Sequence, residues 1–392
     1  MINVVSWAAS YGNLDHRNLV EAAFTDKDVT ACADLDGRGL LQVFDPSDER
    51  KVPFAATRAA AVLDAAWTKA GLRSARNRLD GRGDRIRYPD TALVVGSSLA
   101  LADEACEATE NPDKRMGPYA LSKLRGNALT APLAIRFGLG GGSHCVSAAS
   151  ATGGAAVVHA ANLIRAKQAD RVAVVCLDEM RHNVITSGLG STGASSLSEK
   201  SQPLSVDRSG MRPITAAVAM ILETDESCQA RGQGSMAQWV GGCVRHECHH
   251  LMVPTPSCDA LIEASLSSLE QAGLTTGTID WVSLHATGTR VWDDLEVRCA
   301  KRLFGSRLPH LSAFKRSFGH TMGAAGLLEA GLLCEGLASR RLPPWPCPTD
   351  PALELTKPLK IRSYATNAMM WSAGMGGDVA ANIFSASAGQ GR

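Results

Sequence analysis

The segment Val146-Ser-Ala-Ala-Ser-Ala-Thr-Gly-Gly-Ala-Ala-Val-Val-His-Ala-Ala161 decides the fold class and contains the first candidate catalytic residue. Its pattern predicts a strand end, a tight turn and a helix whose first turn begins at Ser150. Val157, Ala161 and Ile164 form one apolar face of that helix. Unpaired N–H groups at a helix start favour an anion or a developing oxyanion. Ser150 is therefore placed as a nucleophile would be.

The rest of the chain alternates short β-branched runs with alanine-rich helical stretches. This alternation predicts an α/β fold in which crossover helices join parallel strands. Similar themes before and after residue 235 predict two related halves, 1–235 with the Ser150 turn and 236–392. We expect strands at 2–7, 92–95, 171–177 and 279–285, and helices at 56–70, 259–273, 293–304 and 324–338.

Composition describes a chain of 392 residues that can build two cores. Forty basic and 39 acidic residues give a net charge of +1, which favours neither nucleic acid nor a membrane surface as a partner. The apolar runs are too short to span a membrane, and the first residues lack the pattern of a signal peptide. Eleven irregularly spaced cysteines fit a reducing compartment. We expect a soluble, cytoplasmic protein.

A second group of candidate residues lies in the C-terminal half. His285-Ala-Thr-Gly-Thr289 ends a predicted strand, so its imidazole is expected to project into a pocket and donate to a carbonyl oxygen. Lys315-Arg-Ser-Phe-Gly-His320 follows within thirty-five residues, before a helix of small residues. Two histidines and a lysine, each in a glycine-punctuated turn at a strand-to-helix junction, argue against three incidental residues, although the sequence alone does not bring them together in space.

These motifs, in this order, resemble those of the β-ketoacyl synthases, the condensing enzymes of the thiolase superfamily that elongate fatty acids and polyketides. The resemblance spans most of the chain. It implies a thiolase-like α/β fold, with two similar βαβ halves forming five layers, α-β-α-β-α. The matching stretches are Arg136-Phe-Gly-Leu-Gly140, Ala149-Ser-Ala-Thr-Gly153, His285-Ala-Thr-Gly-Thr289 with Asp293 and Glu296, Lys315 with Gly319-His320, and Gly374-Met-Gly-Gly377.

The resemblance also implies a role for each matching residue. Ser150 corresponds to the acyl-accepting cysteine, His285 and His320 to the pair that polarises the extender thioester carbonyl, and Lys315 to the residue that orients and charge-balances that site. Backbone N–H groups of Ser150 and Met375 correspond to the oxyanion hole. The residues expected to bind a phosphopantetheine arm are Thr287 and Thr289.

Partners and cofactors follow from the same resemblance. The family works with acyl chains carried on the phosphopantetheine of an acyl carrier protein or on coenzyme A. We therefore expect an acyl carrier protein as partner, and neither a bound cofactor nor a metal. The resemblance further implies a homodimer, or a heterodimer with a related ketosynthase-like chain.

The serine leaves three readings of the function open. A helix N-terminus can draw a thiol to thiolate, whereas an alcohol stays protonated and needs a base. In the first reading, the chain is a condensing enzyme in which Ser150 is a Cys→Ser change, natural or engineered, that slows or blocks turnover. Alternatively, it is a natural serine variant that transfers acyl groups or decarboxylates a malonyl thioester. The third reading is a non-catalytic partner subunit that shapes a chain-length tunnel.

Other departures from the family pattern affect the substrate. Ala286 and Trp292 replace glycines, and Ala373 and Met375 replace phenylalanines of the gating loop.

Cys145 is predicted to be buried in a strand, which argues against a substitute nucleophile. The cysteines and histidines of 243–250 match no closed four-ligand zinc pattern.

Overall fold

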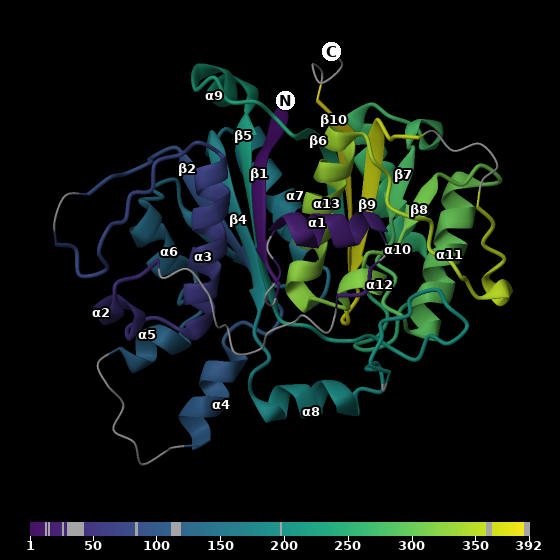
Figure 1. The fold of residues 1–392 in the computed structure, drawn as a ribbon, viewed down its shortest axis with the longest axis horizontal. Coiled ribbons are helices and arrows are strands. Elements are labelled where there is room, and N and C mark those ends of the chain that lie inside the picture. The colour runs from purple at the N-terminus through teal and green to yellow at the C-terminus, as the bar shows by residue number, and fades with distance from the viewer. Residues whose placement is uncertain are drawn as a thin grey trace.

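The computed structural model describes residues 1–11, 14, 16–25, 27–29, 43–82, 85–110, 119–196, 198–357 and 363–387. Within these ranges the strands pair side by side in the order β3-β2-β4-β5-β1-β6-β10-β9-β7-β8 (Figure 1). The strands are β1 (Ile2–Ser10), β2 (Thr91–Gly96), β3 (Ser143–Val146), β4 (Arg171–Asp178), β5 (Ala216–Thr224), β6 (Ala237–His246), β7 (Trp281–Ser283), β8 (His310–Ser312), β9 (Asn367–Ala373) and β10 (Asp378–Ala386).

The strand order has the same plan in each half. On one side β2 is parallel to β3 and β4, and on the other β7 is parallel to β8 and β9. The next two strands, β5 and β1 in one half and β10 and β6 in the other, pair antiparallel. The expectation of parallel strands was therefore wrong for these four strands. The short turn 374–377 joins β9 directly to the antiparallel β10, and a β-branched run has the same composition in either direction.

Helices form three layers around the strands. The principal helices are α1 (His16–Thr25), α3 (Phe54–Lys69), α4 (Ala102–Glu110), α6 (Thr130–Phe137), α7 (Thr152–Arg165), α8 (Asn183–Ser191), α10 (Asp259–Ala272), α11 (Arg290–Phe304) and α13 (Ala325–Ser339). Shorter ones are α2 (Pro46–Glu49), α5 (Ala120–Leu124), α9 (Asp225–Ala230) and α12 (Lys315–Phe318), with 3₁₀ turns at Thr276–Thr278, Met322–Ala324 and Pro351–Leu353.

Three apolar cores lie between the helices and the strands and hold these layers together. One joins α3 and α6 to the first half of the strands, and another joins α10 and α11 to the second half. The third surrounds α7 and α13, which lie between the two halves (Figure 1). This is the five-layered α-β-α-β-α arrangement implied by the motifs. The boundary near residue 235 stays a prediction.

The nucleophile turn ends two residues later than expected, because α7 begins at Thr152. The Thr152 hydroxyl accepts from Ala148 N at 2.9 Å and donates to Ala149 O at 2.5 Å. Ala149 has a left-handed φ of 45°. These contacts close a tight turn, so Ser150 lies just before the helix and not in its first turn.

Glycines bring the two central helices into close contact. A Cβ placed on Gly153 of α7 would lie 2.4 Å from Leu327 N and 2.9 Å from Gly326 Cα of α13. Both atoms belong to the backbone and cannot turn away, so this contact needs a residue without a side chain.

Among the described residues, no helix has the length and hydropathy needed to cross a membrane.

We expect Gly153→Ala to lower the free energy of unfolding by about 1–3 kcal/mol, because the added methyl group pushes α7 and α13 apart. Gly188→Ala is the control, since Gly188 lies in α8 with no atom within 4 Å of its added Cβ. That variant should be neutral or slightly stabilising. Urea denaturation measures both. Equal stability of the two variants would contradict the close packing of the central helices.

Candidate functional site

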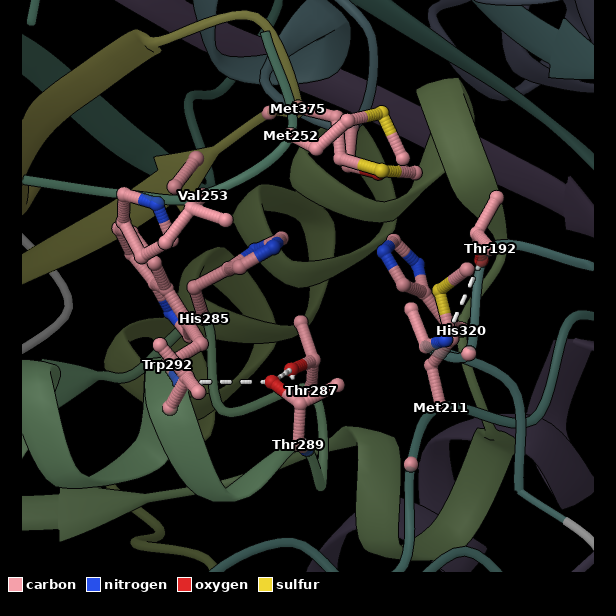
Figure 2. A pocket seen from close by; sticks show the side chains of 18 of the residues that line it. Thr192, Met211, Met252, Val253, His285, Thr287, Thr289, Trp292, His320 and Met375 are labelled. Atoms are coloured by element: carbon pink, nitrogen blue, oxygen red, sulfur yellow. Dashed lines mark hydrogen bonds between the residues drawn. The ribbon is translucent and has the colours of Figure 1, made fainter. Parts of the chain in front are cut away.

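A pocket of about 430 Å³ lies where the turns after β3 and β7 meet. Six of the seven residues predicted from the sequence line it: Ser150, His285, Thr287, Thr289, His320 and Met375. The seventh, Lys315, is buried behind His285. Figure 2 shows the two imidazoles projecting toward the same space, with Met252 and Met375 on one side and the two threonines on the other. The structure thus brings together side chains separated by up to 225 residues in sequence.

The turn that carries His285 is held by two acidic residues of α11. Backbone N–H groups of His285 and Ala286 donate to the Glu296 carboxylate at 2.5 and 2.7 Å. Gly288 N donates to Asp293 at 3.0 Å. Ala286 is forced into a positive φ of 32°, at a position where the related motif has glycine. Burial raises the pKa of Glu296 to about 8 and that of Asp293 to about 6.

A buried ion pair supports His285 from behind. Lys315 Nζ lies 2.6 Å from Glu329 Oε1 and 3.3 Å from His285 Nδ1, and each of these side chains is almost fully buried. Burial raises the pKa of Glu329 to about 7, opposed by the charge of Lys315. An ammonium group can only donate, so Nδ1 of His285 accepts and its proton is on Nε2.

His320 is fixed by backbone groups on three sides. The backbone N–H of His320 donates to Arg212 O at 2.7 Å, and its backbone carbonyl accepts from Ile214 N at 2.9 Å. Its Nδ1 accepts from Met322 N at 3.1 Å. A backbone N–H can only donate, so Nδ1 is the acceptor and the imidazole proton of a neutral His320 is on Nε2.

The two imidazoles lie close together and stay neutral. Their ring centroids are 5.4 Å apart at an interplanar angle of 84°. Burial lowers the pKa of each imidazole well below 6.5, with a further contribution from the positive charge of Lys315. Two neutral rings therefore present Nε2–H groups to one pocket (Figure 2). Such a pair of donors can hold an oxygen on which negative charge develops.

The glycine-rich turn 374–377 packs against the Ser150 turn. A Cβ on Gly374 would lie 2.5 Å from Ala148 O and 3.1 Å from Ser150 N. This contact places Met375, the next residue, beside Ser150 in the lining of the pocket. The pairing of the two backbone N–H groups as an oxyanion hole stays a prediction.

The two threonines lie on the floor of the same pocket. Thr287 and Thr289 share a hydroxyl hydrogen bond of 2.9 Å, and Thr289 Oγ1 also accepts from Trp292 N (Figure 2). Their role toward a pantetheine arm likewise stays a prediction. Trp292 lies edge-on to His285, with ring centroids 5.7 Å apart.

Sequence reasoning missed two structural supports of the site. Glu329 was not singled out, although a glutamate within an otherwise apolar helical stretch signals a buried partner. The segment 210–214 was likewise not assigned to the site. It joins both histidine turns, because Gly210 N donates to Gly288 O at 2.9 Å while Arg212 and Ile214 bind His320.

Cys145 is exposed, so the expectation that it is buried was wrong. It does lie in a strand, but β3 is the edge strand of the described sheet and has one open side. In the part of the chain that the structure describes, no group of three or more His, Cys, Asp and Glu residues is arranged to hold a metal ion.

Comparisons with known proteins agree with this geometry. The chain is 29% identical over 277 residues to 3-oxoacyl-[acyl-carrier-protein] synthase 1 of Haemophilus influenzae, covering 68% of this chain and 67% of that protein. It is 30% identical over 287 residues to a putative mitochondrial 3-oxoacyl-[acyl-carrier-protein] synthase of Schizosaccharomyces pombe, with the same coverage of each chain.

Solved structures show the same fold over 99% of both chains. One belongs to a type II polyketide acyl carrier protein in complex with its ketosynthase, with a TM-score of 0.83 and 18% identity. Another is the ishigamide ketosynthase/chain length factor, with a TM-score of 0.80 and 21% identity. Models of the β-ketoacyl synthase N-terminal and C-terminal domains match residues 39–227 and 236–346, and the chain therefore belongs to the β-ketoacyl synthase family.

Proposed function

We propose that this chain decarboxylates a malonyl thioester and joins the resulting two-carbon unit to an acyl group carried as an oxygen ester on Ser150. The observation that carries the proposal is the pair of neutral, buried imidazoles whose Nε2–H groups face one pocket beside Ser150. The bond between the malonyl α-carbon and its carboxylate breaks, and carbon dioxide leaves. The electron pair forms an enolate whose oxygen His285 and His320 hold.

The enolate then has two fates. Attack of its carbon on the ester of Ser150 forms the new carbon–carbon bond and returns the serine oxygen, which takes up a proton. Protonation of the same carbon instead yields an acetyl thioester. An oxygen ester is a poorer electrophile than a thioester, and an alcohol loads more slowly than a thiolate. We therefore propose slow elongation, accompanied by uncoupled decarboxylation.

One observation favours the decarboxylase reading as a second candidate. The contacts that fix the histidines come from Lys315, Met322 and the backbone, and they do not involve Ser150. Loss of carbon dioxide therefore does not depend on the serine hydroxyl. The partner-subunit reading has less support, because a non-catalytic chain would keep a costly buried ion pair without needing its charge.

An acyl carrier protein is the proposed partner, with a homodimer or a heterodimer as the proposed assembly. The Haemophilus influenzae relative is named for this carrier, and one solved neighbour is described as its complex with a ketosynthase. The ishigamide neighbour is described as a ketosynthase/chain length factor. Substrates on coenzyme A fit the same proposal, and no bound cofactor is proposed.

Ser150→Cys tests the condensing reading. We expect it to raise the yield of elongated β-ketoacyl product by about tenfold or more, because a thiolate loads faster and its thioester is the better acceptor. Mass spectrometry of products and of the acylated protein measures this, with Ser150→Ala as the control that cannot be acylated. A cysteine variant that acylates but still fails to elongate would exclude the condensing reading.

His320→Ala tests the decarboxylation apparatus. Removing one of two N–H donors should slow carbon dioxide release from a malonyl thioester by about 10²–10³-fold. His16→Ala is the control, because His16 contacts Trp7 and Glu335 and does not line the pocket. Release of carbon dioxide is followed with labelled malonyl carboxylate. Unchanged release by His320→Ala would remove the proposed role of the histidine.

The pH dependence gives a further test. The pKa values of both imidazoles are lowered well below 6.5, so both rings stay neutral as the pH falls through that value. We expect the ¹⁵N resonances of both imidazoles to remain those of neutral rings from about pH 8 to about pH 6.5 and to titrate only at lower pH. The rate of carbon dioxide release is not the readout here, because the pKa values of the Glu296 and Glu329 carboxyls, about 8 and about 7, lie inside that range. An imidazole midpoint at or above about 6.5 would show that the rings titrate as exposed histidines do.

A further inference from the structure

Asp178 is a buried carboxylate outside the pocket whose role the proposed chemistry leaves unexplained. It ends β4 in the N-terminal half and is 1% exposed. Four groups in the turn after β2 donate hydrogen bonds to its carboxylate. They are Ser97 Oγ at 2.6 Å, Ser98 N at 2.9 Å, Leu99 N at 2.9 Å, and Ser98 Oγ. A fifth donor comes from the other half of the chain, where Gly323 N lies 2.7 Å from Asp178 Oδ2.

All five donors are uncharged, and they divide between the two carboxylate oxygens. Oδ1 accepts from Ser97 Oγ and Leu99 N, while Oδ2 accepts from Gly323 N and Ser98 Oγ. The neighbouring Glu179 has a different kind of partner, since it pairs with the buried Arg58. Burial raises the pKa of Asp178, and its donors oppose that rise. The Asp178 carboxylate therefore acts as a hydrogen-bond acceptor, and it joins the end of β4 to the turn after β2 and to the turn at Gly323.

The segment held by Asp178 lies directly behind His320. Met322 has a left-handed φ of 50°, which a residue with a side chain rarely adopts without support. A Cβ on Gly323 would lie 2.8 Å from both Asp178 Oδ2 and Ser98 N, so the backbone comes as close to the carboxylate as a glycine allows. The hydrogen bond from Gly323 therefore holds Met322 in its left-handed conformation.

That conformation directs Met322 N–H at His320 Nδ1, 3.1 Å away. We propose that Asp178 is a positioning residue for His320: through Gly323 and Met322 it keeps the imidazole in the tautomer that presents Nε2–H to the pocket. The role in catalysis rests on the proposed function, whereas the effect on the tautomer does not. Asp178 lies in β4, so it also links the two halves of the molecule at the site.

Asp178→Ala removes the acceptor for Gly323, and Asp178→Asn keeps one carbonyl oxygen. Ser97→Ala is the matched control, because it deletes a donor to Oδ1 and leaves the contact with Gly323 in place. We expect Asp178→Ala to lower kcat for carbon dioxide release from a malonyl thioester by about ten- to a hundredfold with little change in KM, as expected of a displaced catalytic group. Asp178→Asn should recover part of that loss.

The second measurement does not need activity. In protein labelled with ¹⁵N-histidine, His320→Ala identifies the His320 resonances, which should report a proton on Nε2. Asp178→Ala should shift them toward a mixture of tautomers, while Ser97→Ala should not, and urea denaturation confirms that both variants fold. That shift would support the positioning role even if the unmodified protein releases no carbon dioxide. Unchanged His320 resonances in folded Asp178→Ala would overturn the proposal, whatever the rates.

Discussion

The site depends on the buried Lys315, because its ammonium contacts Nδ1 of His285 and so decides which nitrogen of that histidine carries the proton, while Glu329 balances its charge. Removing two charges from water costs several kcal/mol for each ion, and their mutual attraction returns that cost only with good geometry. A buried pair is therefore weak evidence of stability and stronger evidence of a role. Here the ammonium lies 2.6 Å from its carboxylate and 3.3 Å from Nδ1 of the histidine.

The fold supplies the surroundings in which this pair can act. Glu329 lies in α13, whose glycine contact with α7 places it near the helix that follows Ser150. The segment 210–214 joins the two histidine turns, and Asp178 fastens the turn behind His320 to the first half. Each imidazole is thereby held from the backbone side and left open toward the pocket. The Ser150 turn and the two histidines thus have separate supports.

Much of this could be predicted from the sequence, for physical reasons that differ between elements. The helix after Ser150 and the buried strand β4 have long, unambiguous patterns of apolar residues, and the structure has both. The glycine-punctuated motifs identified the pocket-lining residues, because tight turns and close backbone approach need those residue types. The antiparallel direction of β5 and β10 was missed, since apolar alternation does not encode strand direction.

Other parts of the site could not be predicted because they depend on contacts made across the fold. Asp178 is followed by another acidic residue, and only the structure separates the one that binds Gly323 from Glu179, which pairs with Arg58. The exposure of Cys145 likewise depends on β3 being at the sheet edge, which is a property of topology. The tautomers of the histidines require their partners to be known.

The central claim is that both histidines donate Nε2–H to one substrate oxygen. A crystal structure of the protein with a malonyl thioester analogue that cannot decarboxylate tests it most directly. The account predicts that the oxygen of the thioester carbonyl lies about 3 Å from Nε2 of both His285 and His320, with the malonyl carboxylate out of contact with Lys315. An analogue bound with that oxygen away from both imidazoles would contradict it.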